Sequence, residues 1–321
     1  MNKRNISKKR ATYILVIAQI LIMIGLSVFV TIAVSERAGN STVEHMKTIS
    51  DIRATIIKEY VSNTENMLSI YSCNPEIIEA VKNPSDENII NAAQKFTEDF
   101  SSKIENLEGI YVSEWNTHVL AHTNRKVVGI TTREGEPLEQ LRDLLIQAGD
   151  GVYDTGIIIS PASGKQIVSM YKGIFDEEGN PIGLVGLGVY TSGLVDMLND
   201  FENRGFDNAE YYMVNVIDGK YIFNEDSSKI TASTENEIVK ELCEKYRNSD
   251  QDETSSFEYV SNEDNERYVS VYNFMADKKW LLVLDDIHSE AFRLSYAMRM
   301  YLIVWWVSVM YILIFLIDLM I

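Results

Sequence analysis

Aromatic side chains that also carry hydrogen-bonding groups gather in the middle of the chain, where they could line a site for a small molecule. Pockets for small ligands are largely apolar with a few placed polar groups, and aromatic faces also attract cations. The same residue types are common in strands because of their bulk alone, so simple packing is the competing interpretation. The candidate ligand-binding residues of this kind are Tyr111, Trp115, His122, Tyr153, Tyr171 and Tyr190.

Charged and metal-binding residue types are sparser in the same region. Arg125 and Arg133 could each hold a carboxylate with two parallel hydrogen bonds, although a surface position is the simpler interpretation of either residue. His118 and His122 stand four residues apart on a predicted strand and therefore on one face. The sequence places no acid or cysteine beside them to complete a metal site. We therefore expect no metal and no cofactor.

Sequence signatures of catalysis are missing from the chain. It contains no HExxH, no GxSxG, no phosphate-binding loop and no kinase or cyclase signature. Asp285 and Asp286 follow an apolar run that begins at Trp280, and this pattern indicates the end of a strand rather than an acid/base pair. We therefore predict that the chain is not an enzyme.

Two uncharged apolar stretches, residues 13–34 and 301–317, are long enough to cross a membrane. About 20 helical residues cross a hydrocarbon core of about 30 Å. The first stretch exceeds the apolar part of a cleaved signal peptide, which has about 7–15 residues, so we expect it to remain as an anchor. Five basic residues and no acid precede it. Because basic flanks stay inside, we expect a cytoplasmic N-terminus and place residues 35–300 outside the plasma membrane.

The charge balance limits the partners of the external part. The chain carries 29 basic and 47 acidic residues, and five of the bases precede the first apolar stretch. This excess of acid argues against nucleic acid or anionic lipid as a partner. Cys73 and Cys243 are the only cysteines. Because we expect them to lie at different heights above the membrane, we predict no disulfide between them.

The external part begins with a helical pattern. Residues 35–72 hold no proline and carry apolar side chains at three- and four-residue steps, which predicts a long stalk helix. Asn74-Pro75 ends this helix, because the residue before proline avoids the helical region. Shorter helices are expected at 76–82 and 88–104.

From residue 109 the apolar period becomes two. Residues 109–190 and 210–286 each follow the order strand, strand, helix, strand, strand, strand. Closing helices are expected at 192–202 and 289–299. The predicted fold class is α+β, with two transmembrane helices flanking a long stalk helix and two tandem PAS-like antiparallel sheets. The predicted divisions are a cytoplasmic tail (1–12), a first span (13–34), stalk and N-terminal helices (35–106), a membrane-distal unit (107–204), a membrane-proximal unit (205–288), a connecting helix (289–300) and a second span (301–321).

This order of elements resembles the double Cache sensor domain of bacterial chemoreceptors, sensor histidine kinases and membrane diguanylate cyclases. The segments HVLAHTN (118–124) and ISPASGKQIVSMYKGIFDEEGNPIGLVGLGVYTSGL (159–194) resemble strands of that family. The likeness covers about residues 35–300. It implies that the distal unit binds the ligand and that the proximal unit couples to the membrane.

Amino-acid-binding members of this family use an Arg and a Trp on the crossover, a Tyr on the next strand and an Asp on the last strand. Tyr153 matches the Tyr, and Gly188 falls at the Asp. Glu136-Pro137-Leu138 replaces the Arg-x-Trp element, with Arg133 close by. The resemblance therefore implies that the carboxylate for an α-amino group is missing, which argues against a free amino acid as ligand.

We accordingly expect an extracellular small-molecule sensor of a transmembrane receptor, of the kind that acts in chemotaxis and other signal transduction. Its ligand would be an organic acid, an amine or an amino-acid-like compound. The output domain is missing from this chain, which is expected to be either a fragment of a longer receptor or a stand-alone sensor that acts through a cytoplasmic signalling partner. A homodimer through the stalk helix is expected, because its apolar stripe exceeds what the PAS-like units can cover. The alternative is an envelope scaffold whose Cache units bind a protein partner.

Overall fold

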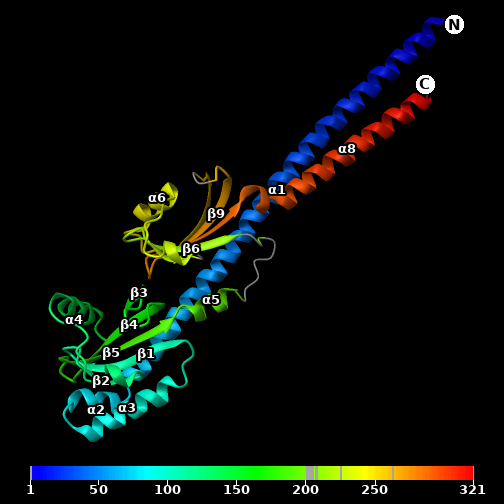
Figure 1. Ribbon diagram of the computed structural model, residues 1–321. Coiled ribbons are helices and arrows are strands. Elements are labelled where there is room, and N and C mark those ends of the chain that lie inside the picture. Colours follow the sequence, from blue (N-terminus) through cyan, green and yellow to red (C-terminus); the bar gives the residue numbers. More distant parts are fainter. Residues whose placement is uncertain (1, 200–205, 207–208, 225, 262–263, 321) are drawn as a thin grey trace.

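One long helix, α1 (Asn2–Ser72), runs along the whole molecule (Figure 1). The last helix, α8 (Arg293–Met320), returns beside its first half, so both chain ends lie at the same end. The two sheets lie one after the other along the remainder of α1. The computed structural model describes residues 2–199, 206, 209–224, 226–261 and 264–320.

Exposed apolar side chains cover the paired ends of α1 and α8. The segments Val16–Ser72 and Arg293–Phe315 each contain a stretch that is long and apolar enough to cross a membrane, by length and composition. Phe29 and Trp305 are among the exposed side chains. Apolar exposure on this scale is typical of helices that lie in lipid. In length and composition the two segments agree with the two predicted spans.

The first sheet contains five strands in the order β2-β1-β5-β4-β3, all antiparallel to their neighbours. Helix α4 (Glu136–Ala148) makes the crossover from β2 to β3. Helices α2 (Pro75–Lys82) and α3 (Glu87–Ser101) pack at the β1–β2 side. We call this part the first unit. Its strands are β1 (Leu107–Glu114), β2 (Val119–His122), β3 (Tyr153–Ile159), β4 (Gln166–Phe175) and β5 (Pro181–Tyr190).

Different helices cover the two faces of this sheet. Val168, Met170 and Val185 are buried in the core that includes α1. Because side chains alternate along a strand, the residues between them face α4, where Leu141 and Leu145 are buried. The face toward α4 is the face on which the sequence-predicted aromatic residues lie.

The second sheet repeats the same order as β7-β6-β10-β9-β8. Its outer face is covered by α6 (Glu237–Tyr246), where Val239 and Cys243 pack with Val283 of β10. Cys243 is buried and Cys73 is exposed, and both are free. We call this part the second unit. Its strands are β6 (Glu210–Asn215), β7 (Tyr221–Asn224), β8 (Glu253–Val260), β9 (Arg267–Met275) and β10 (Trp280–Ile287).

The two units share details as well as strand order. In each, the second strand is followed by a short 3₁₀ helix, η1 (Arg125–Val127) or η2 (Ser227–Lys229). The strand registers also correspond, which confirms the predicted α+β fold with two PAS-like antiparallel sheets. The matching rows across the sheets are Tyr111, Gly186 and Tyr171 in the first unit and Tyr212, Val283 and Tyr272 in the second.

The apolar stripe of α1 is covered by the two sheets. Ile49, Ile57 and Leu68 are almost fully buried in the same core as the strands. The expectation that this stripe exceeds what the PAS-like units can cover is therefore wrong, because α1 lies along both sheets instead of standing free. Ile52 and Ile70 remain exposed on it.

The closing helices differ in extent from the prediction. The helix predicted at 192–202 is α5 (Ser192–Asn199), and residues 200–202 lie outside the described part of the chain. The helix predicted to run from Ser289 into the second span is divided at Phe292 into α7 (His288–Ala291) and α8. A Cβ on Gly39 of α1 would lie 3.4 Å from the Phe292 ring, so this joint packs closely on α1.

Candidate functional site

A row of tyrosines crosses the first sheet on the face toward α4. Tyr111 of β1 and Tyr171 of β4 are both paired with Gly186 of β5. Tyr153 of β3 is paired with Tyr171. Paired residues of neighbouring strands project to the same face, so the three rings gather there. A side chain at Gly186 would overlap the Tyr111 ring, and the glycine therefore lets that ring lie against the sheet.

Helix α4 closes this row into a compact group that we call the first-unit cluster. Leu141 and Leu145 of α4 are at most 2% exposed and supply its aliphatic side. Burial raises the pKa of Tyr111 and of Tyr153, so both phenols are neutral at pH 7. The cluster thus contains four of the six aromatic residues predicted from the sequence. Its members are Tyr111, Trp115, Leu141, Leu145, Tyr153, Tyr171 and Leu184.

Arg133 reaches the first-unit cluster from the loop before α4. Its Nη2 donates a 2.9 Å hydrogen bond to the hydroxyl of Tyr171, and its guanidinium carbon lies 5.0 Å from the centre of that ring. Arg125 and Arg142 form ion pairs with carboxylates, whereas Arg133 forms none with any described residue. A guanidinium in this position can accept a carboxylate from a ligand.

A carboxylate that the sequence analysis missed lies on the same face. The register of β1 shifts at Glu108, which forms a bulge and turns its side chain across β5. A Cβ on Gly188 would lie 2.7 Å from Oε2 of Glu108. The hydroxyls of Ser160 and Ser163 both donate to Oε1 of Glu108, the second at 2.9 Å. A carboxylate from the neighbouring strand therefore lies beside Gly188, contrary to the expectation that this position lacks one.

His122 extends the tyrosine row to β2. Its ring stacks on Tyr111 with centroids 5.5 Å apart and planes at 10°. Its Nδ1 accepts a 2.7 Å hydrogen bond from the backbone N–H of Asn124. Burial lowers the pKa of His122, although Glu108 acts in the opposite direction, so the ring is neutral at pH 7.

Tyr190 and Arg125 lie apart from the first-unit cluster. Tyr190 is on the same face of β5, but its ring lies 5.1 Å from Nζ of Lys165 near the β3–β4 hairpin. Arg125 is exposed, and its Nε donates a 2.6 Å hydrogen bond to Glu98 of α3. No three His, Cys, Asp or Glu side chains in the described ranges are grouped to hold a metal ion.

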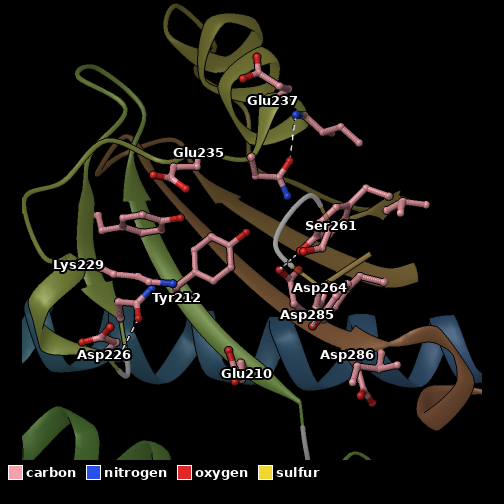
Figure 2. Close-up of a pocket in the computed structure, with 18 residues that line it drawn as sticks. Glu210, Tyr212, Asp226, Lys229, Glu235, Glu237, Ser261, Asp264, Asp285 and Asp286 are labelled. Carbon is pink, nitrogen blue, oxygen red and sulfur yellow. Dashed lines mark hydrogen bonds between the residues drawn. The ribbon is translucent and has the colours of Figure 1, made fainter. Parts of the chain in front are cut away.

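The second unit contains a cavity of about 580 Å³ on the face that α6 covers (Figure 2). Asp285 and Asp286, which line it, lie near the end of β10 as predicted. They are only 8% and 3% exposed, which the sequence analysis did not anticipate. The sequence signal for the burial of Asp285 was the alternation along β10, because Asp285 follows Leu281 and Val283 on the face toward α6.

Solved structures with the same arrangement are sensory domains of bacterial receptors. The sensory domain of the Campylobacter jejuni chemoreceptor Tlp3, solved with isoleucine bound, superposes with a TM-score of 0.57 at 13% identity, over 80% of this chain and 97% of that one. The periplasmic sensory domain of the C. jejuni chemoreceptor Tlp1 gives a TM-score of 0.57 at 15% identity, over 79% and 98%.

A histidine kinase shows the same likeness. The sensor domain of DctB from V. cholerae gives a TM-score of 0.56 at 10% identity, covering 75% of this chain and 95% of that one. No protein-family model matches the sequence, and no curated protein matches it either. The likeness is one of structure, and it shows that the chain has the double Cache fold. That fold occurs here with two complete five-stranded units.

Proposed function

We propose that this chain is the sensory part of a membrane receptor and that its first unit binds a small molecule outside the cell. The first-unit cluster carries the proposal, because it combines aromatic walls with a guanidinium, Arg133, whose partner is a phenol. Largely apolar sites with a few placed polar groups bind small organic molecules. The double Cache fold supports the same role, since the similar structures are sensory domains.

We infer that the ligand carries a carboxylate, an ammonium group or both. Arg133 can donate two parallel hydrogen bonds to a carboxylate. Glu108, fixed by two serine hydroxyls, can accept hydrogen bonds from an ammonium group. The Tlp3 domain was solved with isoleucine and with L-valine, so amino acids and related organic acids are the first compounds to test.

A partly buried ion cluster supports a route for the signal between the units. Nζ of Lys278, in the β9–β10 turn of the second unit, lies 2.5 Å from Oε1 of Glu65 on α1. The same Nζ lies 3.1 Å from Oδ2 of Asp154, which follows Tyr153 of the first-unit cluster. A ligand that moves β3 would therefore act on both α1 and the second unit, within the repertoire of small helix shifts.

The membrane arrangement completes the proposal. The N-terminus lies in the cytoplasm, the two units lie outside the plasma membrane, and α1 and α8 cross it. Two chains pair along α1, where Ile52 and Ile70 are exposed, and a cytoplasmic partner receives the signal. The second candidate is an envelope scaffold, which would use the same two units to hold a protein partner.

Thermal unfolding of the full chain in detergent micelles, screened against amino acids, organic acids and amines, tests the proposed function. A ligand that binds only the folded state raises the melting temperature as its concentration rises. Arg133→Gln should abolish this rise, whereas Arg125→Gln, which alters an exposed pair with Glu98, should preserve it. If no compound raises the melting temperature while a pull-down recovers a stable protein partner, the scaffold is the better account.

A further inference from the structure

The cavity of the second unit has no part in the proposed function. It lies between the sheet and the start of α6, with a volume of about 580 Å³. Its lining includes four tyrosines and seven acidic residues, and Lys229 is the only base among the described lining residues. Figure 2 shows Glu235 and Glu237 on the side of α6, and Asp264 and Asp285 on the side of the strands. The cavity is therefore strongly negative.

Asp285 is the lining acid that points to a ligand. It is only 8% exposed and lies in line with Leu281 and Val283 on β10. The Tyr259 hydroxyl donates a 3.0 Å hydrogen bond to its Oδ2, and the nearby hydroxyls of Ser270 and Tyr212 also lower its pKa. None of the hydroxyls in the described part of the chain makes a hydrogen bond to Oδ1 in this structure. No basic side chain among the described residues forms an ion pair with the Asp285 carboxylate. A buried carboxylate in this state is unfavourable unless it takes up a proton or a cation enters.

Tyrosine rings provide the walls around this carboxylate. Tyr259 stacks on Tyr268 with ring centroids 5.3 Å apart, and Tyr212 meets Tyr221 edge to face at 5.4 Å. Aromatic faces attract ammonium groups, and the attraction is stronger when the cation is removed from water. Tyr212 is only 8% exposed, so a cation beside it would be largely desolvated.

The acids of the cavity are not grouped to hold a metal ion. In the ranges that the structure describes, no three His, Cys, Asp or Glu side chains come together as a set of metal ligands. A volume of about 580 Å³ is that of a site for an organic molecule. These two observations favour an organic cation over an inorganic one.

We propose that the second-unit cavity binds an organic cation, with an ammonium group beside the carboxylate of Asp285 and carbon atoms against the ring of Tyr212. The internal repeat strengthens the assignment. Asp285 is paired with Ser270 in the second sheet, at the register that Gly188 and Ser169 occupy in the first. The second unit thus carries in its own central strand the carboxylate that the first unit takes from a neighbouring strand.

Isothermal titration of the full chain in maltoside micelles with choline and with putrescine tests the assignment. We expect at least one of these cations to bind, and neither succinate nor calcium chloride to do so. Asp285→Asn keeps the volume and removes the charge, so it should weaken binding at least about tenfold. Glu237→Gln is the matched control, because Glu237 lines the same cavity but pairs with Lys240 at 2.7 Å. It should change the affinity by less than about twofold.

Two further variants separate this site from the first unit and from a folding defect. Tyr212→Leu should weaken binding severalfold even if Asp285→Asn does not fold, and Arg133→Gln should leave cation binding unchanged. Choline that binds more weakly in phosphatidylcholine nanodiscs than in maltoside micelles would identify the natural cation as a lipid headgroup that competes for the cavity. Equal binding in the two would identify it as a free solute. Either result supports the site. The proposal is overturned if neither cation binds, if succinate or calcium binds as tightly, or if Asp285→Asn binds like the wild type.

Discussion

The two units share one sheet topology and one register, yet they fill the helix-covered face in different ways. In the first unit Gly186 lies between Tyr111 and Tyr171, and the rings close into a cluster under α4. In the second unit Val283 occupies the central position between Tyr212 and Tyr272. There the end of the sheet opens into an acidic cavity.

This difference shows that the double Cache fold fixes which face of each sheet a helix covers but not the side chains on that face. In β5 of the first unit, Gly186 lets the Tyr111 ring lie across the sheet, and Gly188 leaves room for the Glu108 side chain of β1. In β10 of the second unit, Val283 and Asp285 occupy the corresponding positions, so the carboxylate comes from the central strand itself. On the proposed assignments, the first unit would hold a ligand through Arg133 and Glu108, and the second unit would hold a cation through Asp285.

The largest effect should follow from giving the first unit the residue of the second. In Gly186→Val the new side chain would overlap the Tyr111 ring, which cannot move away without opening the first-unit cluster. Overpacking of a buried site costs about 3 kcal/mol. Thermal or urea unfolding should show this loss, and Val283→Ala provides the reciprocal change in the second unit. A Gly186→Val variant as stable as the wild type would contradict the arrangement of the ring over the glycine.

A somewhat smaller effect should follow from cutting the link between the units. In Lys278→Met the carboxylates of Glu65 and Asp154 are left facing each other without a cation. Breaking a partly buried ion cluster of this kind should lower the free energy of unfolding by about 2 kcal/mol. The neighbouring Lys279 pairs with the exposed Asp250, so Lys279→Met should cost less than about 1 kcal/mol. If Lys278→Met and Lys279→Met lowered the free energy of unfolding equally, the ion cluster of Lys278 would contribute no more to stability than an exposed ion pair.

The smallest effect concerns pH and separates the second unit from the first. Burial raises the pKa of Asp285 to about 6, well above that of an unfolded aspartate. Its stabilising contribution is therefore complete below about pH 4 and is lost as the pH rises through 6. Between pH 5 and 7 the wild type should lose about 1 kcal/mol through this group. Asp285→Asn should show a correspondingly flatter profile in thermal unfolding, and an unchanged slope would contradict the raised pKa.

Much of this architecture could be predicted from the sequence, because its signals are local. The period-two runs and the helical crossovers gave both sheets in the right order. The short helix predicted after Pro75 is present, and the structure adds that the Asn74 side chain caps it by accepting a hydrogen bond from the N–H of Glu76. Tyr111, Trp115, Tyr153 and Tyr171 were named as site residues, and the structure brings them into one cluster.

The remaining features depend on contacts between distant segments, which no local pattern records. The bulge at Glu108 is set by its pairing with β5, so the carboxylate over Gly188 could not be foreseen. The stripe of α1 was expected to exceed what the sheets can cover, because the sequence does not show that both sheets lie along it. The burial of Asp285 continues the alternation of Leu281 and Val283 along β10, but that pattern alone does not decide it, because a pair of acids at a strand end usually lies in water.

Hydrogen–deuterium exchange of the full chain tests the central claim most directly, because it compares the two units in one experiment. With a carboxylate ligand found in the thermal screen, the peptides of α4 (Glu136–Ala148) and β4 should exchange more slowly, while those of α6 (Glu237–Tyr246) stay unchanged. Arg133→Gln should remove this protection. Protection of α6 alone by such a ligand, or equal protection of both helices, would contradict the account of the first unit as the sensory site.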